Sequence, residues 1–206
     1  MKTNRILQLI PVAALCLLFT SCVDSKVPLS DPNMSKPDER LAGVWRKWDD
    51  VGGGPYYHFA RAGDKLPASV MRMASNSHKS DVTTEQSVPL LLFPTTIGDK
   101  TYLNVADGRE PQTKLVEEKG WTPDTVTAYL IVRYQVTGDV LTMQGIDGDA
   151  KKRAIQAGKI KGAIARDSSG AIRVFFTDTT ENLAKFITAA GDDLFSKDVL
   201  KLERAK

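Results

Sequence analysis

Two alternating segments joined by a Gly-Asp pair constrain the fold of this chain most. Residues 126–136 read VTAYLIVRYQV, with an apolar side chain at every second position, and the run VLTMQGI that follows alternates in the same way. A period of two is typical of a half-buried strand with one face toward solvent. We expect the solvent side of residues 126–136 to carry Thr127, Tyr129, Ile131, Arg133 and Gln135. Because Gly138-Asp139 separates the two runs, the pattern predicts an antiparallel hairpin.

A Gly-Asp pair between two strand-like runs also occurs earlier in the chain. VPLLLFPTTI is followed by Gly98-Asp99 and then by TYLNVA, which predicts a second hairpin. Shorter strand candidates, bounded by Gly, Pro, Asp or Ser, are residues 41–48, 56–61, 70–74, 163–166, 171–177 and 199–204. A sheet of that many strands must curl or close to hide its edges. The sequence therefore predicts a mainly β fold, an antiparallel meander that closes into a small barrel.

Two short helices are expected among these strands. In residues 178–190, Asp178 and Glu181 have the spacing of a capping box, and apolar residues at helical spacing follow until Gly191. Residues 149–158, DAKKRAIQAG, form a weaker amphipathic pattern and are expected at the surface.

The first 22 residues have the layout of an export signal. Lys2 and Arg5 precede an apolar run of fourteen residues, 6–19, and small polar residues then lead to Cys22. Since crossing a membrane takes about 20 apolar residues, a permanent transmembrane helix is the weaker interpretation.

The end of that run, Phe19-Thr20-Ser21-Cys22, resembles the lipobox of bacterial lipoproteins, with Phe19 in place of the usual leucine. The resemblance implies a signal peptide over residues 1–21, removed before Cys22, and attachment of lipid to Cys22 as a membrane anchor. Val23 directly after the cysteine then favours the outer membrane, facing the periplasm. The alternative is an ordinary signal peptide that leaves Cys22 free or discards it.

Composition agrees with an exported single domain that does not bind nucleic acid. Both cysteines lie before residue 23, so the rest of the chain can form no disulfide. Loss of residues 1–21 takes away Lys2 and Arg5, which leaves 26 basic against 25 acidic residues, without the positive excess that polyanion binding needs. Residues 22–40 are rich in Pro, Ser and charge and predict a flexible tether, followed by one β-rich domain over 41–206.

The start of this domain, Gly43-Val44-Trp45, resembles the Gly-x-Trp opening strand of lipocalin-like barrels. The resemblance implies a lipocalin-like barrel in which Arg204, near the chain's end, lies across the ring of Trp45 as a structural pair. It also implies an apolar interior that could hold a small hydrophobic ligand. The residues expected to line it are Leu130, Val132, Tyr134, Leu141 and Met143, with the alternative that these side chains only fill the core.

A basic cluster is the other candidate site. Five cations stand in eleven residues without an acid between them: Lys151, Lys152, Arg153, Lys159 and Lys161. Beside a membrane such a cluster would contact an anionic surface; the plainer interpretation is a solvated helix face.

No catalytic or metal-binding motif accompanies these features. The chain has only two histidines, His58 and His78, and lacks HExxH, Cys-x-x-Cys and Gly-x-Ser-x-Gly patterns, so we expect no cofactor, no metal and no catalysis. The sequence favours a cell-envelope lipoprotein that binds a protein partner or a small apolar ligand. The alternatives are a structural envelope lipoprotein with a filled core and a hydrolase whose site has no sequence signature.

Overall fold

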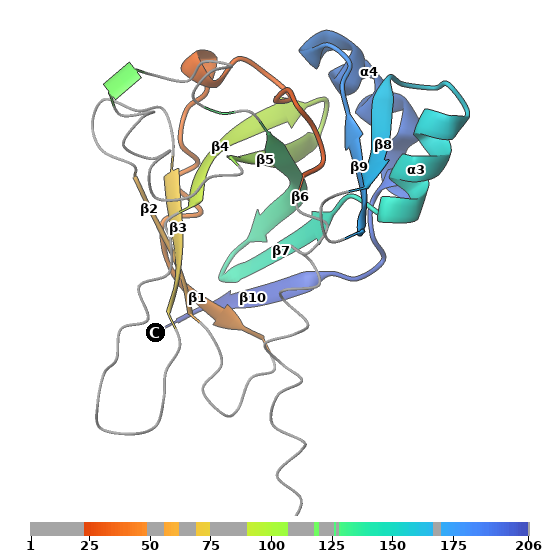
Figure 1. The fold of residues 1–206 in the computed structure, drawn as a ribbon. Coiled ribbons are helices and arrows are strands. Elements are labelled where there is room, and N and C mark those ends of the chain that lie inside the picture. The colour runs from red at the N-terminus through yellow and green to blue at the C-terminus, as the bar shows by residue number, and fades with distance from the viewer. Residues whose placement is uncertain are drawn as a thin grey trace, which may run out of the picture.

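The computed structural model describes residues 23–48, 56–61, 90–106, 128–166 and 170–205, the residues Glu118, Lys119 and Val126, and the backbone of 69–74. In this part of the chain, antiparallel strands close into a barrel in the order β1-β10-β7-β6-β5-β4-β3-β2 (Figure 1). The strands are β1 Gly43–Lys47, β2 Tyr56–Arg61, β3 Ser69–Ala74, β4 Leu90–Ile97, β5 Lys100–Ala106, β6 Tyr129–Thr137, β7 Val140–Gly145 and β10 Leu200–Arg204. The predicted mainly β fold, a meander closing into a small lipocalin-like barrel, is confirmed.

The two predicted hairpins are present in this barrel. β4 pairs with β5 and β6 pairs with β7, and in each case only the Gly-Asp pair separates the last paired residues. Gly98 and Gly138 have φ angles of 63° and 59°, which residues with a side chain rarely adopt. Glycine at these positions therefore permits the two-residue turns.

A second group of elements, the side module, lies between β7 and β10 in the sequence and packs beside the barrel (Figure 1). Within it, β8 and β9 form a two-stranded antiparallel sheet separate from the barrel. The side module consists of α3 Gly148–Gln156, β8 Gly162–Arg166, β9 Ile172–Phe176, α4 Thr180–Ala190 and the 3-10 helix η2 Gly191–Leu194.

Both predicted helices are therefore present, but the start of α4 differs from the expectation. Asp178 does not cap this helix; Thr179 is the N-cap, and its hydroxyl accepts a hydrogen bond from Asn182 N at 3.2 Å. The Asp178 carboxylate instead accepts bonds from Lys161 N and from the Asn182 side chain. It therefore connects the beginning of α4 to the residue that precedes β8.

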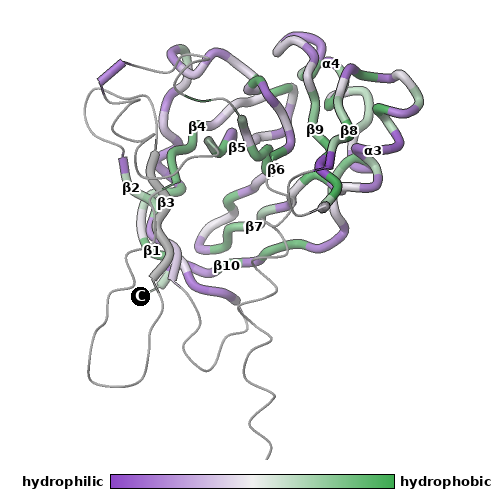
Figure 2. The backbone as a smooth tube through the Cα atoms, viewed as in Figure 1, coloured by the Kyte–Doolittle hydropathy of each residue, from purple (hydrophilic) through white to green (hydrophobic). Residues whose placement is uncertain are grey.

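Apolar side chains form two cores, and Figure 2 shows hydrophobic residues along the strands β4, β5 and β6 that separate them. The inner core, inside the barrel, consists of Leu41, Trp45, Tyr57, Phe59, Leu92, Leu103, Val105, Val132, Tyr134, Leu141, Met143 and Leu202. The outer core, between the barrel and the side module, consists of Leu29, Tyr102, Ile131, Ala150, Ala154, Ile160, Phe176, Leu183, Ile187, Leu194 and Phe195.

Strand β6 separates the two cores, and this corrects one expectation. Val132 and Tyr134 point inward as the alternation predicts. The opposite face was expected in solvent, yet Tyr129 and Ile131 are only 4% and 0% exposed. The expectation fails at this end of the strand because the side module and the N-terminal segment cover it, while Gln135, further along, is exposed.

The N-terminal segment 23–40, which we call the strap, lies along the outside of the barrel (Figure 1, red to orange) and includes the short 3-10 helix η1 Pro32–Met34. Ser25 forms a bridge with Tyr129, and Leu29 is buried in the outer core. Leu29 N also donates to the side chain of Asn104 at 2.7 Å. The described residues of the predicted tether are thus bonded to the domain, because their backbone groups find partners on β5, β6 and β9.

Candidate functional site

The predicted lipid-anchor residue Cys22 lies outside the described residues, which begin at Val23. Asp24, the next residue, is already fixed: its N–H donates to Tyr129 O at 2.8 Å, and its carbonyl accepts from Phe176 N at 2.8 Å. The chain that leads from Cys22 therefore joins the domain within two residues, at the junction of β6 and β9.

A buried ion pair strengthens this junction. Asp24 Oδ1 lies 2.6 Å from Lys151 Nζ, and the two side chains are 4% and 1% exposed. Asp24 Oδ2 accepts from Ile131 N at 2.9 Å, and Lys151 Nζ also donates to Val23 O at 3.3 Å. Burial raises the pKa of the Asp24 carboxyl, while Lys151 and the Ile131 N–H act in the opposite direction. The pair connects the strap, β6 and α3 at one point.

This pairing removes Lys151 from the predicted membrane-facing cluster, because its ammonium group is buried against Asp24. The other members remain at the surface: Lys152 is half-buried, and exposed positions are occupied by Arg153, Lys159 and Lys161. The spacing of α3 contains a signal for the difference that we missed. Lys151 precedes Ala154 by three residues and Ile155 by four, which places it on the apolar side of the helix.

An open groove of about 920 Å³ runs between α3 and α4. Its floor is apolar and built largely from small side chains, and Arg153, Lys159 and Lys185 stand along it. Lys185 is paired with Glu181 at 2.6 Å, whereas Arg153 and Lys159 form no ion pair with another described residue. The apolar part of the lining comes from Ala150, Ala154, Ala157, Ile160, Phe186, Ala189, Ala190 and Leu194.

Two acids also line this groove: Asp193, which is exposed, and Asp178. The Asp178 carboxylate accepts from the Asn182 side chain at 2.8 Å and from two backbone N–H groups, and these bonds hold its pKa below the ordinary value. Its oxygens are therefore engaged within the protein. With Arg153 and Lys159 unpaired against the one exposed acid Asp193, the groove offers an apolar surface with an excess of positive charge, which suits a ligand that is apolar and carries an acidic group.

The residues predicted to line a ligand site inside the barrel all face its interior. Four of them are members of the inner core and Leu130 packs against it. They meet the side chains of other strands there, among them Trp45 from β1 and Phe59 from β2. The four members are Val132, Tyr134, Leu141 and Met143, and their burial is what both the ligand-lining and the core-filling interpretation require.

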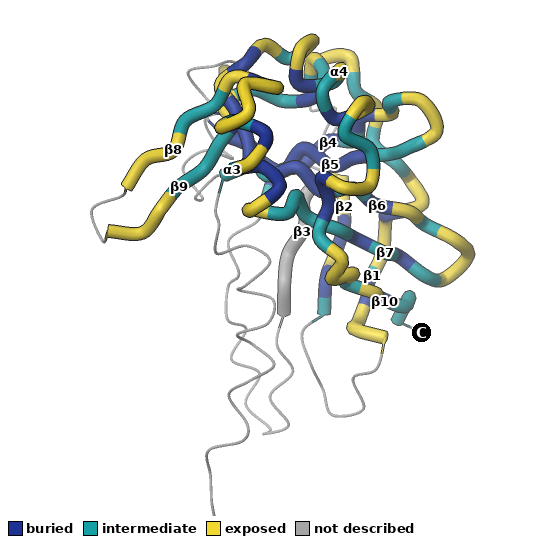
Figure 3. Tube along the Cα trace, turned by 90° about the vertical axis from the view of Figure 1, so that its right-hand side faces the viewer, coloured by how far each residue is buried: buried dark blue, intermediate teal, exposed yellow. Residues whose placement is uncertain are grey.

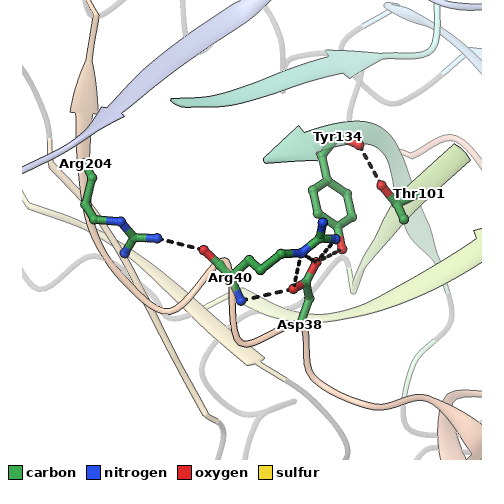
Figure 4. A network of polar contacts seen from close by, with 5 residues as sticks. All are labelled: Asp38, Arg40, Thr101, Tyr134 and Arg204. Atoms are coloured by element: carbon green, nitrogen blue, oxygen red, sulfur yellow. Dashed lines mark hydrogen bonds and ion pairs between the residues drawn. The ribbon is translucent and has the colours of Figure 1, made fainter. Parts of the chain in front are cut away.

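Trp45 and Arg204 come together at one end of the barrel. They are opposite each other in the β1–β10 pairing, and the guanidinium carbon of Arg204 lies 4.3 Å from the centre of the Trp45 ring. The same guanidinium donates to Ala42 O at 2.7 Å. It also donates to Arg40 O at 2.9 Å (Figure 4). Arg204 therefore fastens the end of the strap beneath the first strand.

A polar network continues from there into the barrel (Figure 4). Arg40 donates from Nε and Nη2 to Asp38, at 2.9 Å and 2.7 Å, and Tyr134 Oη donates to Asp38 Oδ2 at 2.8 Å. The bond from Arg40 holds the pKa of Asp38 below its usual value, and burial raises the pKa of Tyr134. Asp38 and Arg40 fall in the segment predicted as a tether, and no periodic pattern in the sequence marks this closure of the barrel end.

The described residues add little that is typical of catalysis. His58 is exposed on β2, and His78 falls outside the described residues. Among the residues that the structure places, no three His, Cys, Asp or Glu side chains come close enough to hold a metal ion. None of the helices in that same part is long and apolar enough to span a membrane.

Comparison with known proteins gives no match to a family model, to a curated protein or to a solved structure. Arguments about function therefore rest on the residues of this chain. Two arrangements stand out: the junction of strap and side module that follows Cys22, and the groove on the same helix, α3.

Proposed function

We propose that this chain is a non-catalytic lipoprotein of the bacterial cell envelope, anchored to the outer membrane through lipid on Cys22 and facing the periplasm. Its domain binds an apolar partner molecule that carries an acidic group. The observation that carries this proposal is the groove between α3 and α4, with its apolar floor and unpaired cations. Small-molecule sites are commonly concave, mostly apolar and a few hundred Å³ or more in volume.

The position of the groove supports its link to the anchor. Lys151, on the same helix α3, donates to Val23 O, one residue after Cys22. Ser25 is paired with the domain, and three residues span at most about 10 Å. A lipid on Cys22 would therefore hold the side module close to the membrane surface, where amphiphilic molecules are concentrated.

The groove replaces the barrel interior as the proposed site. The inner core contains twelve buried apolar residues, Leu41 and eleven from the strands, and the five expected lining residues pack among or against them. The interiors of small barrels are commonly filled by side chains, which a ligand would then have to displace. The groove is open and needs no such displacement.

The anchor is tested by the intact mass of protein purified from membranes, beside a Cys22→Ser variant. The expected mass is that of residues 22–206 plus a diacylglyceryl group and one further acyl chain, and the variant should lose this modification and membrane retention. An unmodified chain that begins elsewhere would reject the anchor.

The groove is tested with a fluorescent fatty acid as probe. Ala189 lines the groove and is exposed, whereas its neighbour Thr188 is exposed on the same helix but does not line it. We expect Ala189→Trp to abolish probe binding and Thr188→Trp to leave it unchanged. Lys159→Glu should weaken binding, whereas Lys36→Glu, on the strap beside β4, should not. Equal binding by all variants would place the site elsewhere.

A structural role in the envelope is the second candidate, favoured by the packed inner core. The two functions separate genetically. If the protein acts as a spacer, a strain that carries only Ala189→Trp should behave like the wild type, while a deletion disturbs the envelope. If it acts through the groove, the substituted strain should resemble the deletion.

A further inference from the structure

The β8–β9 hairpin belongs to the side module but is not part of the barrel sheet, and its strands do not line the groove. Residues that share one of its faces are Gly162, Ile164, Arg166, Ile172, Val174 and Phe176, because Gly162 pairs with Phe176 and Arg166 with Ile172. At the base this face is covered: Phe176 is fully buried in the outer core, and a side chain at Gly162 would clash with Ile155 of α3.

Toward its turn the same face extends past the helix. Ile164 is 42% exposed and Ile172 is 51% exposed, two of the five large apolar residues that the described chain leaves exposed. Figure 3 shows this end of the hairpin standing out from the body of the molecule, with its distal residues exposed. The apolar face is thus buried in the outer core at the base of the hairpin and exposed at its other end.

The hairpin carries an excess of positive charge. Between residues 159 and 177 the sequence has a single acid, Asp167, against the cations Lys159, Lys161, Arg166 and Arg173. Lys26, on the strap, lies over the ring of Phe175 at 5.2 Å and adds another cation to the hairpin. Arg166 shares the face of the two isoleucines and pairs with Ile172, while Arg173 lies on the opposite face. Exposed isoleucines on a hairpin that carries cations match the apolar interior and the anionic headgroups of a membrane surface.

The strap enters the domain on the same side. Ser25 pairs with Phe176 in parallel, so Val23 and Asp24 precede this bridge on the side of Ile172, the first residue of β9. Resting on the lipid anchor proposed above, we propose that the tip of this hairpin, around Ile164 and Ile172, is a second membrane contact that inserts at an anionic lipid surface and fixes the orientation of the domain.

The test uses a polarity-sensitive dye on a single introduced cysteine in the purified full protein, reconstituted in vesicles of phosphatidylethanolamine and phosphatidylglycerol. Ile172→Cys reports on the hairpin. Val199→Cys is the matched control, because Val199 is also about half exposed, at 48%, but precedes β10 on the barrel. The unsubstituted protein, labelled in parallel, gives any background from Cys22.

The dye at 172 should shift to the blue and become several-fold less accessible to a water-soluble quencher, and the dye at 199 should not. Each cation removed, as in Lys161→Gln, should weaken the partition of the hairpin to vesicles about fivefold, and vesicles of neutral phosphatidylcholine should give a smaller shift. Equal accessibility at both positions overturns the membrane contact, including the case in which the hairpin binds a protein.

The intact mass of the same preparation separates this result from the anchor. A lipid-modified mass with an accessible residue 172 would reject the hairpin contact and keep the anchor. An unmodified mass would reject the anchor, and the dye at 172, measured with the same vesicles added to the protein, would still decide whether the hairpin contacts lipid.

Discussion

The inner and outer cores lie on opposite faces of the same strands but are held together differently. The inner core is closed by apolar side chains from nearly every strand of the barrel, with the Tyr134 hydroxyl as a polar group that reaches out of it to Asp38. The outer core contains polar groups that are themselves buried, among them Asp24, Lys151 and Asn104. Hydrogen bonds of these polar groups join the strap to the rest of the domain.

This difference has a physical consequence. Apolar burial is not directional, so the inner core should tolerate exchanges that keep volume. A buried polar group costs free energy unless its partner is in place, so the outer core depends on a few exact pairings. The strap, which supplies several of these partners, should therefore matter more to stability than its sequence suggests.

The largest effect is expected at the buried ion pair. Lys151→Met leaves the Asp24 carboxylate buried without its counter-charge, and breaking such a pair costs about 3–5 kcal/mol. We expect a loss of that size in the free energy of unfolding, measured by urea denaturation.

The double variant Asp24→Asn with Lys151→Met sharpens this prediction. It removes both charges and retains an acceptor for Ile131 N, so most of the lost stability should return, since apolar replacements of buried pairs are often neutral. A double variant as unstable as the single one would show that packing around Lys151, and not charge, holds the junction.

The inner core should respond to volume alone. Leu103 is fully buried on β5, and Leu103→Ala should cost about 2–5 kcal/mol of unfolding free energy. Leu103→Met should cost less than about 1.5 kcal/mol. If Leu103→Met were as damaging as Leu103→Ala in the same denaturation experiment, the inner core would depend on exact shape and the contrast with the outer core would fail.

A smaller loss is expected at Asn104, which links the strap to β4 and β5. Its side chain is fully buried, accepts from Leu29 N at 2.7 Å and donates to Thr95 Oγ1 at 2.8 Å. Asn104→Leu leaves the Leu29 N–H unpaired and should cost about 1–3 kcal/mol. Hydrogen exchange at Leu29 should rise in this variant while exchange at Leu103 stays unchanged; a uniform rise would mean that the whole barrel has loosened.

The inner core is the half of the fold that the sequence predicts. Alternation in residues 126–136 identifies which side chains of β6 face inward, and the Gly-Asp pairs locate two hairpin turns, because both signals are local. The helices of the side module are likewise found by their spacing, with an error of one residue at Thr179.

The outer core could not be found in this way, because its pairings join residues far apart in the sequence. Asp24 and Lys151 are 127 residues apart. A short polar segment has the composition of a linker whether or not it forms hydrogen bonds with the domain. The sequence predicts the two helices that line the groove, but it does not predict that they lie next to each other. In the sequence Ile164 and Ile172 look like ordinary strand residues. Only the structure shows that α3 covers the base of the hairpin and leaves these two exposed.

The smallest effect should appear at the barrel end, where the two kinds of bonding meet. The pKa of Asp38 is lowered, chiefly by its bond from Arg40. A lowered carboxyl pKa contributes stability above the ordinary value of about 3.9, and this contribution is lost as the pH falls through the lowered pKa. Unfolding free energy measured from acid to neutral pH should therefore fall less steeply at the acid end in Asp38→Asn than in the wild type.

Tyr134→Phe, which keeps Arg40 on Asp38, should lose only about 1 kcal/mol at neutral pH. If Tyr134→Phe flattened the acid limb as much as Asp38→Asn does, the tyrosine and not the arginine would set the ionisation of Asp38, and the inner core would reach further into the polar closure than its packing indicates.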